Sequence, residues 1–357
     1  MAVKRRKPKP LLFIFMFLAV ICIAVGGTWV YLSGPVESGN DEVVDVEISS
    51  GTSTRKIGEI LEEKGLIHSQ YMFMIYVKLY KVNNLKASTY QMNKGMNLSE
   101  IINVLQEGST YNPNAIKLTF KEGQRITDFA KTISDNTNND YDSIITMMKD
   151  REYVSKLIPN YWFLTDVILD DNIYYPLEGY LAPDTYYFDN KDVDVDTIVN
   201  TMLKEMDKKL STYKSVIGND VHKYMTMASI VELEGTNTEN RKMIVGVFNN
   251  RLAKGMNLGS DVTTYYGLQA DMKNDLTSQQ FNTINAYNTR STTMMGKLPI
   301  GPICNPSLSS IEASVEPTDN DYLFFVADKH GKIYYTKTMK EHEAKIAEIK
   351  ANGDWIF

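Results

Sequence analysis

Cysteine and histidine are scarce in this chain, and their scarcity excludes several classes of site. Of 357 residues, two are cysteine (Cys22 and Cys304) and four are histidine. Two cysteines cannot form a disulfide framework or a four-cysteine metal site. No two histidines stand four residues apart, the spacing that puts both zinc ligands of a peptidase on one helix face. The sequence therefore excludes a disulfide framework, a four-cysteine metal site and a zinc-peptidase helix motif.

Acidic residues are missing from the first 32 residues, which contain five Lys or Arg. The rest of the chain carries 33 bases and 44 acids, and so acidic a body is a poor match for a phosphate backbone. We therefore expect no nucleic-acid partner. The chain is 43% hydrophobic and 23% charged, close to the globular average, and its length predicts two or three domains of roughly 100 to 200 residues each.

One long apolar run begins the chain. Residues 11–32 contain no charge, and at about 1.5 Å per residue a helix of this length crosses a bilayer core of about 30 Å. The basic residues precede it, which predicts a cytoplasmic tail at 1–10, a transmembrane helix at 11–32 and an extracytoplasmic remainder. Trp29 and Tyr31 fall where an interfacial aromatic belt is expected. The alternative is a cleavable signal peptide ending near Ala24-Val25-Gly26, although such apolar regions are usually shorter.

A spaced glycine pattern organises the next segment. A polar linker is expected at 33–40. Beyond it, Gly51, Gly95 and Gly123 are each followed at +6 and +10 by large apolar residues. The two apolar residues of each pair are four positions apart, so they contact each other on one helix face. Asn97 and Glu100 predict the start of the middle helix. We expect a small α+β module at 41–110 and an α+β domain at 111–357.

A second block, EGYLAPDTY at 178–186, is rich in aromatic residues and broken by Gly and Pro. Aromatic rings offer flat apolar faces with a polar edge, so the block fits a platform for sugars. It fits an ordered loop in the core equally well.

The segment VHKYMTMASIVELEG at 221–235 reads as an amphipathic helix in which Glu232 falls on the apolar face and Glu234 nearer the opposite side. Desolvation keeps such a carboxylic acid protonated near neutral pH, as the general acid of glycosidic bond cleavage requires. Alternatively, Glu232 turns outward at the helix end beside Gly235. Thr236 and Glu239 predict a capping box that starts the next helix.

Ordered blocks in the last 140 residues, together with EGYLAPDTY, resemble the MltG/YceG-like family of endolytic murein transglycosylases. In chain order these blocks are SIVE (229–232), GVFNNRL (246–252), GMNLGSD (255–261), YGL (266–268), YNT (287–289), LPIGPICNP (298–306) and DYLFFVA (321–327). The anchor and the module at 41–110, which would be LysM-like, also fit that family, and the resemblance covers nearly the whole chain beyond residue 41.

The resemblance implies a membrane-anchored enzyme that cuts MurNAc–GlcNAc bonds inside nascent peptidoglycan strands and leaves 1,6-anhydroMurNAc ends. Glu232 would be the catalytic acid and then the base, with no metal or cofactor. The substrate-binding shell would contain polar residues of the matched blocks: Asn250, Ser260, Asp261, Tyr287, Asn288, Thr289 and Asn305. The implied partners are peptidoglycan strands, the membrane and peptidoglycan synthases.

Two other functions stay open. A hydrolytic muramidase needs a second carboxylate about 5 to 9.5 Å from the first, for which Asp261 and Glu234 are candidates. A non-catalytic scaffold that binds the cell wall would account for the anchor, the module and the aromatic residues, but not for an acid in an apolar stripe.

Overall fold

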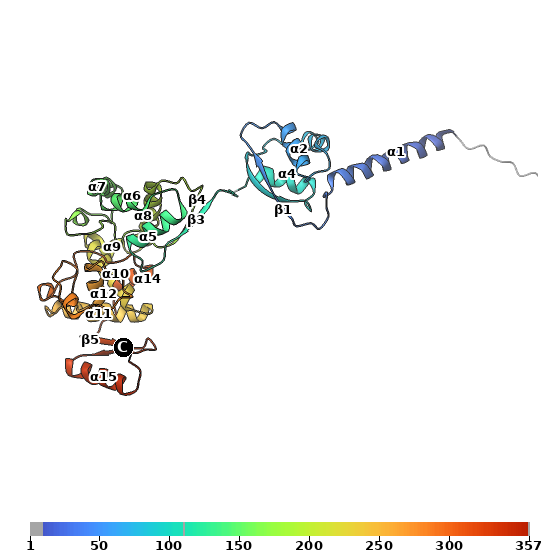
Figure 1. The fold of residues 1–357 in the computed structure, drawn as a ribbon. Helices are drawn as coiled ribbons and strands as arrows, with labels where there is room; N and C mark the ends of the chain where they lie inside the picture. Colours follow the sequence, from blue (N-terminus) through green and yellow to red (C-terminus); the bar gives the residue numbers. More distant parts are fainter. Residues whose placement is uncertain (1–9, 110, 356–357) are drawn as a thin grey trace, which may run out of the picture. The chain divides into compact units, whose positions relative to one another are not determined.

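The computed structural model describes residues 10–109 and 111–355 (Figure 1). The chain divides into two compact units between Asn114 and Ala115. Within the described residues every sheet consists of two antiparallel strands, and helices make up most of the rest. This confirms the predicted mixed α+β class.

The first unit begins with helix α1 (Pro10–Ser33), whose stretch from Phe15 to Ser33 is long and apolar enough to cross a membrane. None of the side chains in its most apolar window is buried by the protein, as expected for a helix that faces lipid. The helix is thus consistent with the predicted single-pass anchor. The predicted basic tail lies outside the described residues except for Pro10.

A small module follows α1 in the same unit. Its elements are β1 (Val43–Ile48), α2 (Thr54–Glu63), α3 (Gln70–Leu79), β2 (Ser88–Asn93) and α4 (Leu98–Glu107). The strands pair in antiparallel register with Val46 opposite Tyr90, and both side chains are fully buried. Asn97 and Glu100 form the predicted capping box at the start of α4. Helix α3 was not predicted by the glycine pattern.

The second unit opens with a helical layer against a short two-stranded antiparallel sheet. Its elements are β3 (Ile116–Thr119), α5 (Ile126–Asn136), α6 (Tyr141–Lys149), α7 (Arg151–Leu157), β4 (Thr185–Phe188), α8 (Val195–Ser211) and α9 (Lys214–Ile217), with 3-10 turns at Ile158–Asn160, Asp166–Leu169 and Gly218–Asp220. The EGYLAPDTY block lies in the core of this layer, where Tyr180, Leu181 and Ala182 are at most 1% exposed. Of its two interpretations the ordered core loop is therefore correct, because buried rings have no face to offer a sugar.

The remaining elements include helix α10 and a hairpin, and they end in a helix. They are α10 (Val221–Glu234), α11 (Thr238–Ala253), α12 (Asp261–Gly267), α13 (Ser278–Phe281), a 3-10 turn at Thr292–Met294, α14 (Leu308–Val315), β5 (Phe324–Ala327), β6 (Ile333–Thr336) and α15 (Met339–Ala351). Helix α11 is capped by Asn237, whose side chain accepts a hydrogen bond from the amide of Asn240. The predicted box at Thr236 and Glu239 is therefore wrong by one residue, since Asn is a better N-cap residue than Thr.

Helix α10 lies between two hydrophobic cores. Met225 and Ala228 belong to the core of the helical layer, whereas Ile230 and Val231 belong to a second core formed with α11 and α12. Every residue from Met225 to Val231 is buried. The helix consequently has no solvent face over these two turns, and the helical wheel alone does not say which of its carboxyl groups meets a cavity.

Candidate active site

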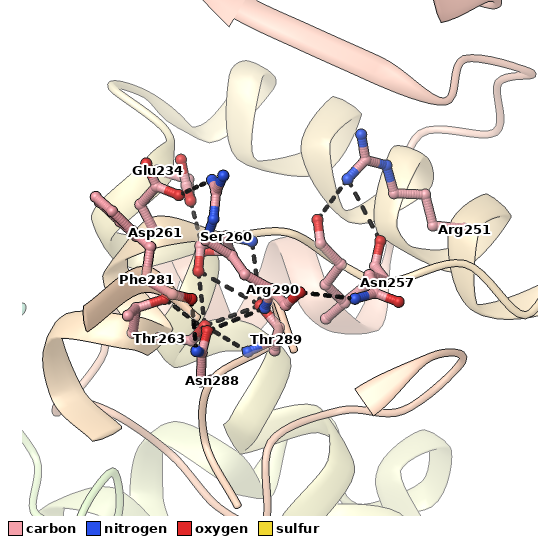
Figure 2. Close-up of polar contacts among 12 residues, drawn as sticks. Glu234, Arg251, Asn257, Ser260, Asp261, Thr263, Phe281, Asn288, Thr289 and Arg290 are labelled. Atoms are coloured by element: carbon pink, nitrogen blue, oxygen red, sulfur yellow. Dashed lines mark hydrogen bonds and ion pairs between the residues drawn. The ribbon is translucent and has the colours of Figure 1, made fainter. Parts of the chain in front are cut away.

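Glu234 is the last residue of α10, and it is half-buried at the edge of a pocket. Ser260 donates its hydroxyl hydrogen to Oε1 of Glu234 over 2.6 Å (Figure 2). Burial raises the pKa of Glu234, and the negative charge of Asp261 raises it further, while the hydrogen bond from Ser260 and the charge of Arg251 oppose the shift. The result is a carboxyl group that is biased toward its protonated form.

A pocket of about 280 Å³ opens beside this carboxyl group. Its lining combines Glu234 and Asp261 with apolar side chains of the C-terminal hairpin and tail: Phe325, Val326, Ala327, Ile333 and Trp355. An apolar wall that faces a few polar groups is the usual composition of a ligand site, and an aromatic ring matches the apolar face of a sugar. The pocket thus brings a carboxyl group whose pKa is raised together with a cavity lined by apolar and aromatic side chains.

A buried hydroxyl network fixes Ser260 in place (Figure 2). The amide of Ser260 donates to Oγ1 of Thr289 over 3.1 Å, and the hydroxyl of Thr263 donates to the Ser260 carbonyl over 2.6 Å. Thr263 and Thr289 have no exposed surface. Because both partners are enclosed, the hydroxyl of Ser260 stays aimed at Glu234.

Asp261 begins α12 and forms an ion pair with Arg290. The guanidinium of Arg290 also lies 5.0 Å from the centre of the Phe281 ring (Figure 2). The side chain of Asp261 is 52% exposed, so this carboxylate meets both the pocket and solvent. Asp261 is therefore a charged neighbour of Glu234 that already has a cationic partner.

Arg251, on α11, forms hydrogen bonds with both walls of the pocket. Its Nε donates to the carbonyl of Leu323, directly before β5, and its Nη1 donates to the carbonyl of Leu258 in the loop that leads to Ser260. Burial lowers the pKa of Arg251, while the charge of Glu234 acts in the opposite direction. The guanidinium thus fixes the hairpin relative to the acid and places a positive charge near it.

Glu232, the acid expected from the sequence, has different surroundings. Its side chain is 6% exposed, and its Oε1 pairs with Nη2 of Arg241 over 3.0 Å. Its Oε2 accepts hydrogen bonds from the amide and hydroxyl of Ser307 and from the hydroxyl of Ser310, at 2.9, 2.5 and 2.7 Å. A cation, three donors and a helix N-terminus are the partners that an ionised carboxylate takes in a protein interior.

Through these contacts Glu232 connects three helices. Arg241 lies on α11, and Ser307 is the N-cap of α14, so one carboxylate connects α10, α11 and α14. The sequence predicts the catalytic acid at Glu232, and that role stays a prediction. Glu234 is a second candidate, because burial raises its pKa and it lines the pocket, whereas Glu232 is bonded to a cation.

The structure places the predicted substrate-binding residues in two groups. Ser260 and Asp261 lie at Glu234 and the pocket. Asn250 holds the chain before β5, because its amide donates to the carbonyls of Asn320 and Tyr322. The others are at most 1% exposed: Tyr287, Asn288, Thr289 and Asn305. Their burial indicates that these four side chains support loops, and a substrate-binding role for them stays a prediction.

Two of these buried side chains show what such support involves. Oδ1 of Asn305 accepts from the amides of Gly179 and Leu181, and its amide donates to Glu178. Asn288 accepts from the hydroxyl of Thr264 and donates to two carbonyls in the loop after α13. Both therefore satisfy buried polar groups of the loops around the site.

Sequence reasoning missed the groups that complete the pocket. Arg290, Arg251 and the hairpin residues were not assigned to a site, and Glu234 entered only as a possible second carboxylate. The block at 321–327 contributes Phe325, Val326 and Ala327 to the lining, but nothing local in DYLFFVA indicates that it faces α10. Among residues 10–109 and 111–355 no cluster of three or more metal-ligating side chains occurs. That the chemistry needs no metal stays a prediction.

The chain is similar to known proteins over nearly its whole length. Residues 46–348 match the model of the YceG-like family. An endolytic murein transglycosylase of Bacillus subtilis (strain 168) is 35% identical over 340 residues, which cover 93% of each chain. A protein of the same name from Streptococcus pneumoniae (strain D39) is 32% identical over 88% of this chain and 60% of its own. A crystal structure of a YceG-like protein from Listeria monocytogenes superposes with a TM-score of 0.60 at 37% identity, covering 85% of this chain and 99% of that one.

Proposed function

This chain belongs to the YceG-like family, and from that premise we propose that it is an endolytic lytic transglycosylase that cleaves peptidoglycan glycan strands. The observation that carries the proposal is the carboxyl group of Glu234, whose pKa is raised beside a pocket with an aromatic and aliphatic wall. Curated relatives that carry the name of this activity at 32 to 35% identity support it.

The chemistry requires one proton donor that later becomes the acceptor. Protonated Glu234 gives its proton to the oxygen between MurNAc and GlcNAc, and that bond breaks. The resulting carboxylate then takes the proton of the sugar's own 6-hydroxyl, whose oxygen closes onto the anomeric carbon. The strand ends in 1,6-anhydroMurNAc, no water is consumed, and Glu234 is protonated again.

The neighbours of Glu234 serve both halves of this cycle. The charge of Asp261 and the burial of Glu234 favour the protonated form that starts the reaction. The hydroxyl of Ser260 and the charge of Arg251 favour the carboxylate that finishes it. The pKa of Glu234 is therefore set between two opposing influences, as suits a group that acts as acid and then base.

Hydrolysis is the competing reaction, and Asp261 is the residue on which it would depend. A second carboxylate would activate water or attack the anomeric carbon. Asp261 is already engaged in an ion pair with Arg290. We therefore favour the intramolecular route.

We further propose a single-pass protein of the cell membrane, with a cytoplasmic N-terminus and an extracytoplasmic enzyme that acts on nascent strands near peptidoglycan synthases. The apolar helix α1 supports the anchor, and the basic residues before it support the orientation. That residues 41–110 form a LysM-like module stays part of this proposal.

The deciding experiment compares Glu234→Gln, Glu232→Gln and the exposed control Glu239→Gln on purified glycan strands, with products weighed by mass spectrometry. Glu234→Gln should lower cleavage by at least about 100-fold, and Glu239→Gln should leave it unchanged. Anhydro ends are lighter than reducing ends by one water. Reducing ends from the unaltered protein would favour the muramidase, and full activity of Glu234→Gln would remove Glu234 from the chemistry.

A further inference from the structure

Helix α3 (Gln70–Leu79) exposes an apolar face that the fold of its module does not require. Outside α1, the first unit exposes five large apolar side chains among its described residues, and four of them lie on α3 or directly after it: Tyr71, Ile75, Leu79 and Tyr80. Each is more than half exposed. Met72 and Phe73 of the same helix already fill the core. An apolar stripe on an otherwise complete module marks an interaction surface.

The exposed face is continuous with the membrane-spanning helix. The ring of Trp29, in the last turns of α1, stacks on Tyr76 of α3 at 6.2 Å, and Tyr76 stacks on Tyr80 at 4.3 Å. Tyr31 stacks on His68, directly before α3, at 4.6 Å. An aromatic row thus runs from the end of the span along α3.

This row determines the depth of α3. Trp and Tyr at the end of a spanning helix lie at the level of the lipid headgroups. A ring stacked on Trp29 lies at nearly the same depth, so Tyr76 and the face beside it are brought to the membrane surface. The charges agree, since residues 69–82 contain Lys78 and Lys81 and no acid. Basic and aromatic side chains together suit an interface with anionic lipid.

We propose that α3 lies in the membrane–water interface, with Tyr71, Ile75, Leu79 and Tyr80 inserted at the boundary of headgroups and acyl chains. The occupant of the face is lipid, because the span that adjoins it is itself enclosed by lipid. The proposal rests on the anchor proposed above. Its consequence is that the module sits against the bilayer and is not free to move about on a tether.

The test places an environment-sensitive fluorophore at single cysteines in full-length protein that carries Cys22→Ser and Cys304→Ser. Three labelled positions are compared: Ile75→Cys on the face, Ile23→Cys in the span and Asn103→Cys at an exposed position of α4. The protein is reconstituted in vesicles of phosphatidylglycerol and phosphatidylcholine whose acyl chains are brominated midway along their length.

Quenching at position 75 should reach at least about half of that at position 23 and exceed that at position 103 by at least about threefold, as expected for shallow insertion. Tyr71→Ser with Leu79→Ser should abolish quenching at position 75. Val43→Ser, a matched control that removes the exposed apolar residue outside the face, should not.

Each failure has its own signature. Quenching at position 23 without quenching at position 75 overturns the interfacial helix and leaves the anchor intact, whereas no quenching at position 23 overturns both. A label at position 75 that is accessible to aqueous iodide in pure vesicles but shielded in native membranes would assign the face to a protein partner and refute a lipid occupant.

Discussion

Replacing Glu232 by Gln should cost the protein stability, with chemistry impaired only as far as folding is. The amide oxygen of Gln keeps an acceptor for Ser307 and Ser310, but its amino group then faces the guanidinium of Arg241, donor against donor. Arg241 already has one unsatisfied donor, because its Nε is buried without a hydrogen bond. Its side chain is 13% exposed. The substitution therefore leaves a largely buried cation uncompensated.

Removing one member of a buried ion pair typically costs about 3 to 5 kcal/mol, a large part of the roughly 5 to 15 kcal/mol that stabilises a domain. We expect this loss in urea unfolding of the purified protein in detergent, followed by circular dichroism. Glu232→Gln combined with Arg241→Gln should recover part of the loss, because the pair is then removed together and the two substitutions are not additive. Glu234→Gln is the matched control and should unfold no more easily than the unaltered protein.

The result that would refute this reasoning is specific. If Glu232→Gln unfolds at the same urea concentration as the unaltered protein and yet loses cleavage, Glu232 takes part in the chemistry and its purely structural role is refuted. If it unfolds early but cleaves normally per folded molecule at low temperature, its role is structural.

Four further outcomes follow from individual residues. The cleavage rate should fall as pH rises through the raised pKa of Glu234. Ser260→Ala should move this fall to higher pH in a rate profile, because the hydrogen bond that the variant lacks stabilises the charged form of Glu234. Burial raises the pKa of Glu178 to about 8, so the stability that its neutral form contributes is fully present below about pH 4.5 and is lost as pH rises toward 8. Between these pH values the unfolding free energy should fall by about 1.4 kcal/mol per pH unit. Glu178→Gln should flatten this dependence of the unfolding free energy on pH. Cys304 is a buried free thiol that donates a hydrogen bond to the carbonyl of Ser229. Cys304→Ser should therefore retain activity in the product assay, and non-reducing mass mapping should find no disulfide. Protease added to intact, wall-stripped cells should degrade residues 115–357; complete protection would contradict the proposed topology.

Several features follow from local sequence, because the interactions that create them lie within a few residues. An uncharged run of sufficient length forms an apolar helix whatever the rest of the chain does. The box of Asn97 and Glu100 joins neighbours three positions apart, and it is present in the structure. The +6 and +10 residues after the spaced glycines are buried for the same reason, since one helix turn brings them together.

The roles of Glu232 and Glu234 were beyond local reasoning. The two residues stand two positions apart, both near the end of a helix whose middle turns are enclosed between two cores. What separates them is the identity of distant partners: Glu232 meets Arg241 and Ser307, while Glu234 meets Ser260 and the pocket wall. A helical wheel records direction around an axis, whereas the charge state of a buried carboxyl depends on whether a cation is buried with it, and only the tertiary structure decides that.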